Sequence, residues 1–245
     1  MNYKEFFKKL IRFIKQDKVI FGIVAITLLV IICIASLDSG ISGDEPQYQY
    51  PQSVNLYNYY ASLGKDTSCL SFFNLKYYGC SFDLISYAFI KWFHIDNHFE
   101  ARHFMNAITG WGGVLFTGLL AALLIGWKFG ILAMLLLFIN PRFLGDSFSN
   151  CKDIPFAMTY IMALLAIAIL VNYLPKINKK TLLFVAVSIA AAISVRVGGL
   201  ILIAELFMFV AVFYIVKNGF KSVFSQKGFK DVYQIGFKLI LTSII

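Results

Sequence analysis

Acidic and basic side chains recur in polar segments that separate long apolar runs. Asp44 and Glu45 form an acidic pair just beyond the first apolar run, and Asp153 follows a polar loop before a later one. A carboxylate can take a proton from a hydroxyl or an amine, so carboxylates brought together suit general acid–base chemistry. Basic residues expected on the same side suit phosphate binding: Lys76, Arg142, Lys152 and Arg196. The simpler alternatives are a solvated loop with a helix cap at Asp44–Glu45, and an N-cap at Asp153.

Arg196 is the basic residue that its surroundings make most informative. It lies between two apolar runs, in the segment Arg196-Val197-Gly198-Gly199. An unpaired Arg within a membrane costs about 2.5 kcal/mol or more on insertion scales, so such residues tend to be paired or functional. We expect Arg196 to bind a phosphate at the membrane edge, where the glycines allow close approach. Snorkelling to the interface or pairing with Glu205 is the alternative.

Histidine and cysteine could each indicate a special site. His94, His98 and His103 lie in an aromatic stretch typical of a membrane interface and lack matched Cys or acid spacing. We therefore interpret them as surface histidines and assign no metal ligand. Cys69 and Cys80 share the first polar loop, where a disulfide would form if that face is oxidising, although two free thiols are the simpler interpretation.

The composition predicts a polytopic membrane protein. Hydrophobic residues make up 59% of the 245 residues, charged residues 14%, and the mean hydropathy is +0.75. The net charge of +9 arises from basic residues clustered between apolar runs, as membrane topology requires, and not from one basic face. No nucleic-acid recognition motif accompanies the charge, so DNA and RNA binding are excluded.

The apolar runs predict an all-α fold with about six complete transmembrane helices and a partial seventh. Residues 181–216 are nearly all apolar. One helix of that length would be roughly 54 Å long against a hydrocarbon core of about 30 Å, so a turn at residues 194–199 is expected to divide it. The other spans are expected at residues 19–37, 103–126, 129–144 and 155–173, and interfacial helices in the loop at residues 38–102.

Charge placement predicts the orientation. Residues 1–18 read as an amphipathic cytoplasmic lead-in and residues 19–245 as the membrane domain. Segments expected inside hold 14 of the 22 Lys and Arg, and those expected outside hold nine of the 13 Asp and Glu. Both biases place the N-terminus in the cytoplasm, in what we expect to be a bacterial inner membrane. The seventh run begins at Phe237 and stops at Ile245, so we expect a chain shortened at its C-terminus.

Four segments together resemble the GT-C glycosyltransferases, the membrane enzymes that use polyprenyl-phosphate sugars and include protein O-mannosyltransferases and aminoarabinose transferases. The segments span about residues 19–216 and are Gly43-Asp44-Glu45, Lys76-Tyr77-Tyr78-Gly79, Ser149-Asn150-Cys151-Lys152-Asp153-Ile154-Pro155, and Arg196-Val197-Gly198-Gly199. Members of this family usually have more spans and often a soluble C-terminal domain, both of which would lie beyond Ile245.

The resemblance implies a sugar transferred from a lipid phosphate to a lipid, glycan or protein acceptor on the extracytoplasmic face. Asp44 would be the general base and Asp153 a second acid that orients the acceptor or stabilises positive charge on the sugar. Arg196 and Lys76 would neutralise the leaving phosphate, with Lys152 and Arg142 as further donor-binding candidates. Glu45 would position Asp44 or a metal. No cofactor is certain; some relatives use a divalent cation, which oxygen ligands alone do not establish.

Two other functions remain open at this point. A transporter or lipid flippase would need a charged site within an apolar run, and Glu205 is the one acid so placed. A non-catalytic, truncated remnant of the enzyme is the other alternative, which the short last run favours.

Overall fold

The computed structural model describes residues 3–174, 177–219 and 233, and these residues form helices and no strand. The chain divides into two compact units, residues 1–158 and 159–245. The first unit holds α1 (Tyr3–Leu37), η1 (Glu45–Gln49), α2 (Tyr50–Ala61), η2 (Ser68–Leu70), η3 (Phe73–Tyr77), α3 (Ser81–Phe93), α4 (His98–Ile125), α5 (Trp127–Phe138), α6 (Pro141–Ser149) and the start of α7 (Asp153–Tyr173). The second holds the rest of α7, α8 (Lys179–Val195), η4 (Val197–Leu200) and α9 (Ile201–Asn218).

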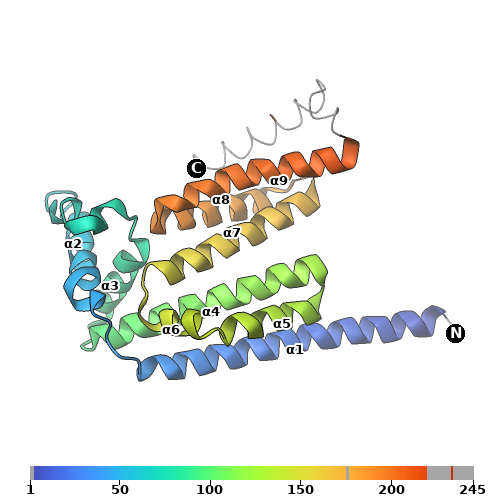
Figure 1. Ribbon diagram of the computed structural model, residues 1–245, viewed down its shortest axis with the longest axis horizontal. Coiled ribbons are helices and arrows are strands. Elements are labelled where there is room, and N and C mark those ends of the chain that lie inside the picture. The colour runs from blue at the N-terminus through green and yellow to red at the C-terminus, as the bar shows by residue number, and fades with distance from the viewer. Residues whose placement is uncertain (1–2, 175–176, 220–232, 234–245) are drawn as a thin grey trace. The chain divides into compact units, whose positions relative to one another are not determined.

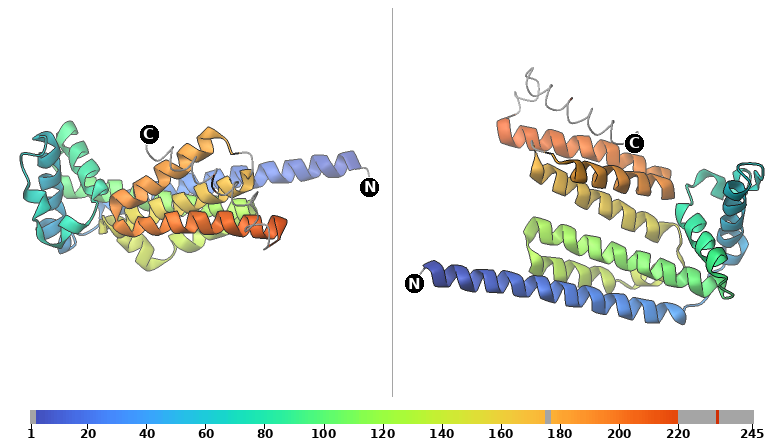
Figure 2. Two further views of the ribbon diagram at one scale, coloured as in Figure 1. Left: turned by 90° about the horizontal axis from the view of Figure 1, so that it is seen from above. Right: turned by 180° about the vertical axis from the view of Figure 1, so that it is seen from behind.

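The core of the first unit lies where α1, α4 and α5 pack side by side (Figures 1 and 2). Phe21, Ala25, Leu28 and Ile32 recur at helical spacing on one face of α1 and meet buried residues of the other two helices. The Trp111 indole N–H donates to the Ala25 carbonyl oxygen at 2.7 Å, which joins α4 to α1 across this core. The predicted lead-in and first span therefore form one continuous helix, α1.

Glycines on α4 allow α6 and the start of α7 to approach closely. A Cβ atom added at Gly110 would lie 2.4 Å from Ser147 Oγ, and one added at Gly112 would lie 3.0 Å from Met158 Cγ. Gly113 is similarly close to Phe143, at 3.3 Å. Glycine at these three positions therefore permits close helix packing.

The long polar loop folds into helices at one end of α1 and α4. α2 packs on α3, and α3 packs on α4 (Figure 1). Pro51 was expected to interrupt a helix, but it lies in the first turn of α2, directly after the π-helical turn η1. A proline is tolerated there because the first N–H groups of a helix have no partner within it.

Within the described part of the chain, four helices are long and apolar enough to cross a membrane, and the number rises to five if a bent pair counts as one span. The four are Gln16–Leu37, His98–Ile125, Asp153–Tyr173 and Val197–Lys217. The expected single span at residues 129–144 is instead a pair, α5 and α6, bent by 69° where Asn140 caps α6 and Pro141 opens it. α8 has 17 residues, or roughly 25 Å, which is shorter than a bilayer core of about 30 Å. Six complete spans are thus not confirmed, and the run from Phe237 lies outside the described residues.

In the second unit the expected turn at residues 194–199 is confirmed. α8 ends at Val195, and η4 leads into α9. A Cβ atom at Gly199 would lie 2.6 Å from the backbone nitrogen of Ile193, so this turn folds back onto the end of α8 and requires glycine. The Tyr160 hydroxyl of α7 donates to the Glu205 carboxylate of α9 at 2.6 Å.

The tight packing of α4 predicts different effects of the same substitution at two helix glycines. Gly110→Ala should lower the unfolding temperature in detergent, because its Cβ overlaps Ser147 and such overpacking costs about 1–3 kcal/mol. Gly22→Ala on α1 is the matched control, since no atom lies within 4 Å of its added Cβ and alanine favours the helix by about 1 kcal/mol. Equal unfolding temperatures for the two variants would contradict this packing.

Candidate functional site

A fully buried ion pair joins α3 to α4. Arg102 Nη2 lies 2.6 Å from Asp83 Oδ1, and the two side chains are 0% and 2% exposed. Arg102 Nη1 donates to Ser86 Oγ at 3.0 Å. Asp83 and Ser86 are three residues apart on α3, so the helix presents both to the same guanidinium.

Two thiols lie beside this ion pair. Cys80 directly precedes α3, and its thiol donates to the Leu75 carbonyl oxygen at 3.7 Å; Cys151 follows α6 and is close enough to Arg102 for the guanidinium to influence its pKa. Burial raises the pKa of each thiol to about 12, although Arg102 acts in the opposite direction on both. The thiols are therefore protonated near neutral pH and are poor nucleophiles. Cys69 and Cys80 are both free, so the simpler interpretation of that pair is confirmed.

A second buried polar group ties the end of α1 to α4. His103 Nε2 lies 2.8 Å from Glu45 Oε1, with side chains 1% and 0% exposed. The other ring nitrogen of His103, Nδ1, is 2.8 Å from Ser39 Oγ. The Ser42 backbone N–H donates to Glu45 Oε2 at 2.7 Å. The two ring nitrogens of His103 thereby bind both ends of the loop between α1 and η1, one at Ser39 and the other at Glu45.

Three of the four predicted segments meet around these buried groups. Glu45 belongs to the first segment, and its carboxylate is close enough to Cys151, in the third, to raise the pKa of that thiol. The Lys152 ammonium lies 5.6 Å from the ring centroid of Tyr78, in the second segment. Residues more than 100 positions apart in the chain are therefore brought to one end of α4.

The two carboxylates predicted for catalysis are at the surface of this cluster. Asp44 is exposed and precedes η1, but its side chain makes no cap, and the described residues offer its carboxylate no hydrogen-bond partner. Asp153 is exposed at the start of α7 and accepts from Asn150 Nδ2 at 3.0 Å. The cap of α7 is provided by Asn150, whose Oδ1 accepts from the Asp153 N–H at 3.0 Å. The N-cap role considered for the Asp153 side chain stays a prediction.

The predicted basic residues occupy different environments. Lys76 is exposed, 5.2 Å from the Tyr77 ring, and so flanks the tyrosine pair that Lys152 contacts from the other side. Arg142 is 92% exposed and lies 3.9 Å from Asp146. Arg196 is half-buried between α8 and η4 in the second unit, so its convergence with Asp44 stays a prediction.

The three histidines do not share one environment, as the surface interpretation required. His94 is exposed and His98 half-buried, but His103 is buried and bonded to Glu45. The surface interpretation is therefore wrong for His103. Its ring lies on the face of α4 toward the loop, where Ser39 and Glu45 hydrogen-bond with its two nitrogens. Among the described residues, no group of three or more His, Cys, Asp or Glu side chains could hold a metal ion.

Asp83 and Arg102 are the site residues that sequence reasoning missed. Asp83, Ser86 and Ile90 recur at helical spacing and form the buried face of α3, whereas Ile85 and Phe89 are exposed. The available signal was this polar stripe on an otherwise apolar helix, combined with an Arg at the start of the next apolar run. Each residue alone reads as an interfacial charge.

No protein-family model matches the chain, and the searches of curated proteins and of solved structures found no significant match either.

The buried ion pair predicts a large and non-additive effect on stability. Arg102→Met leaves Asp83 buried without its partner, which should cost about 3–5 kcal/mol of unfolding free energy. Pairing it with Asp83→Leu removes the unpaired charge and should recover most of that loss.

Thermal and denaturant unfolding in detergent measure this double-mutant cycle. Arg142→Met, at an exposed ion pair of 3.9 Å, is the control and should change stability by less than about 1 kcal/mol. A double variant no more stable than Arg102→Met would contradict the assignment.

Proposed function

We propose that this protein is a membrane glycosyltransferase that moves a sugar from a polyprenyl-phosphate donor to a lipid, glycan or protein acceptor. The reaction would take place on the extracytoplasmic face of a bacterial inner membrane, with the N-terminus in the cytoplasm. The basis of the orientation is the distribution of Lys and Arg between the apolar runs. In this proposal the α5–α6 pair and α8 also cross or enter the membrane, which gives six spans, and α2 and α3 lie at the interface.

The observation that carries the proposal is the meeting of three segments that are far apart in sequence. The Lys152 ammonium lies over the Tyr78 ring. The pKa of the Cys151 thiol is influenced by both Arg102 and Glu45, so these residues are close together. A buried network that holds exposed carboxylates and ammonium groups at one end of a helix pair suits a reaction that separates charge. The buried groups meet the needs of stability, and these needs do not account for the exposed Asp44 or the half-buried Lys152.

The chemistry assigned to these residues is an inverting displacement. An acceptor hydroxyl or amine attacks the anomeric carbon of the sugar while Asp44 takes its proton. The bond between that carbon and the donor phosphate oxygen breaks, and the phosphate leaves with the electron pair. Lys76 and Lys152, together with Arg196 and Arg142, neutralise the charge that builds on the phosphate. Asp153 orients the acceptor or stabilises the positive charge on the sugar.

Glu45 acts in this proposal as a positioning residue for Asp44. Its carboxylate is fully buried, and both oxygens are occupied, one by His103 and the other by the Ser42 N–H. A carboxylate so engaged is poorly placed to hold a metal or to move a proton. Because Asp44 directly precedes Glu45 in the chain, the Glu45–His103 hydrogen bond determines where the Asp44 carboxylate lies.

The first test is transfer activity of variants in reconstituted membranes. Asp44→Asn should lower the release of polyprenyl phosphate by at least about a hundredfold, because the amide cannot take a proton. Asp153→Asn should lower it as well. The probes are undecaprenyl-phosphate mannose and undecaprenyl-phosphate aminoarabinose, each with radiolabelled sugar and a membrane extract as the source of acceptors.

Asp38→Asn is the matched control, since Asp38 is an exposed acid in the same loop and should leave activity unchanged. Full activity of both Asp44→Asn and Asp153→Asn would remove the proposed roles. Glu205→Gln separates the transport alternative: loss of lipid or solute transport in this variant, with Asp44→Asn unaffected, would favour a transporter.

The positioning role of Glu45 and His103 predicts a specific kinetic change. His103→Gln should lower kcat about tenfold or more while KM changes little, because a displaced base reacts more slowly with substrate that is still bound. Gly110→Ala is the control for a purely structural loss and should lower stability without lowering kcat. Equal changes in kcat for the two variants would contradict positioning.

A further inference from the structure

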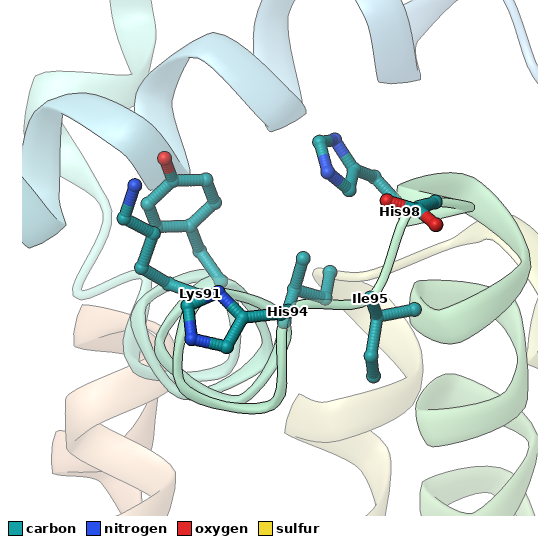
Figure 3. A pocket seen from close by; sticks show the side chains of 7 residues that line it. Lys91, His94, Ile95 and His98 are labelled. Atoms are coloured by element: carbon teal, nitrogen blue, oxygen red, sulfur yellow. The ribbon is translucent and has the colours of Figure 1, made fainter.

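A cavity of about 220 Å³ opens between the end of α3 and the start of α4, in the first unit. Figure 3 shows Lys91 and His94 entering it from the end of α3, and Ile95 and His98 from the connection to α4. The Asp96 carboxylate and the Tyr87 ring complete the polar part of the lining. The cavity therefore contains an ammonium, a carboxylate and two imidazoles, and none of these residues has a role in the proposed transfer reaction.

His98 is prepared to donate a hydrogen bond into this cavity. The Tyr50 hydroxyl lies 2.5 Å from His98 Nδ1, and the two rings are nearly parallel. Burial, and next the neighbouring Tyr87, raise the pKa of Tyr50, so Tyr50 remains a phenol that can donate to Nδ1. A neutral imidazole that accepts at Nδ1 carries its proton on Nε2, which makes Nε2 the donor.

His94 occupies a position that normally selects glycine. It ends α3 with φ of +51°, in the left-handed region, and the Ile95 N–H bonds back to the Ile90 carbonyl oxygen at 3.1 Å. Glycine is the usual residue at such a helix end, and other residues are disfavoured there. A His at this position places an imidazole at the cavity wall, which a Gly would not do.

The opposite face of α3 is apolar and exposed. Ile85, Trp92 and Phe93 are 60%, 70% and 65% exposed, and Phe89 is 40% exposed. Tryptophan and phenylalanine on a short amphipathic helix are typical of the boundary between lipid headgroups and acyl chains. A helix of this kind lies along the membrane interface, so the cavity at its end is expected at the depth where headgroups are found.

The charges of the lining select among headgroups. Lys91 and Asp96 contribute one positive and one negative charge to the lining. A purely anionic headgroup would meet the Asp96 carboxylate unfavourably. A zwitterionic headgroup satisfies both charges, since its phosphate can pair with Lys91 and the imidazole N–H groups while its ammonium pairs with Asp96.

We propose that this cavity binds the phosphoethanolamine headgroup of a membrane phospholipid, with the phosphodiester on Lys91 and His98 and the primary ammonium on Asp96. This binding site goes beyond the proposed transferase function and does not depend on it.

The test counts lipids bound to the detergent-solubilised protein by native mass spectrometry during titration with phosphatidylethanolamine or phosphatidylglycerol. The unmodified protein should bind phosphatidylethanolamine about three- to fivefold more tightly, the range expected of one partly exposed ion pair. Asp96→Asn should reverse this preference toward phosphatidylglycerol. Lys91→Gln should weaken both lipids by a similar factor.

Two further variants complete the design. His94→Asn keeps a residue that tolerates the left-handed backbone and should weaken both lipids, while Lys65→Gln, at an exposed lysine of the same loop, should change neither. Unchanged lipid preference in Asp96→Asn, or equal binding of the two lipids to the unmodified protein, would overturn the proposal. Soluble glycerophosphoethanolamine is titrated in parallel; binding as tight as that of the lipid would overturn the membrane source of the headgroup.

Discussion

The ion pair between Asp83 and Arg102 is the interaction on which the first unit depends. Both groups are withdrawn from water, with side chains 2% and 0% exposed, so each would carry a desolvation penalty of several kcal/mol without the other. The pair is tolerated because the Ser86 hydroxyl accepts a further hydrogen bond from the guanidinium. Any arrangement of α3, α4 and the α6–α7 connection that separated them would leave a buried charge unpaired. The need to keep the two charges together gives the polar end of the first unit a unique packing. Apolar contacts alone would specify that packing less strictly.

Two consecutive residues of α4 hold the two ends of the long polar loop. Arg102 binds Asp83 near the loop's end, and His103 binds Glu45 near its start. Neighbouring residues on a helix point about 100° apart, so they reach different segments from one turn. The loop at residues 38–102 is consequently anchored to a single point of α4, and the exposed Asp44 is one residue from that anchor. Preorganisation of this kind is what a general base requires if it is to meet a substrate in a defined geometry.

Sequence reasoning predicted the elements more successfully than their contacts. Apolar runs of about 20 residues located α1, α4 and α7, and the length of residues 181–216 against the bilayer thickness located the turn at Gly199. The bend between α5 and α6 was missed because Asn140-Pro141-Arg142 follows an apolar run and was included in one span, and hydropathy does not register a proline as a change of direction. Asp44, Glu45 and Lys152 were identified from their types and sidedness. Their buried partners were not, because pairing across 19 or 58 residues is decided by tertiary packing and leaves no local pattern.

The orientation of α3 connects the buried network with the surface cavity. An amphipathic helix at an interface normally directs its polar face to water, but α3 directs Asp83 and Ser86 inward. The attraction of the Arg102 guanidinium for these groups outweighs their hydration, since an unpaired Arg at that depth would cost more than the two polar groups lose. The helix is thereby rotated so that its aromatic residues face outward, where water would disfavour them and lipid would not. The same rotation carries Lys91 and His94 to the wall of the cavity. One buried charge pair thus determines both the anchoring of the loop that carries Asp44 and the face of α3 that is exposed.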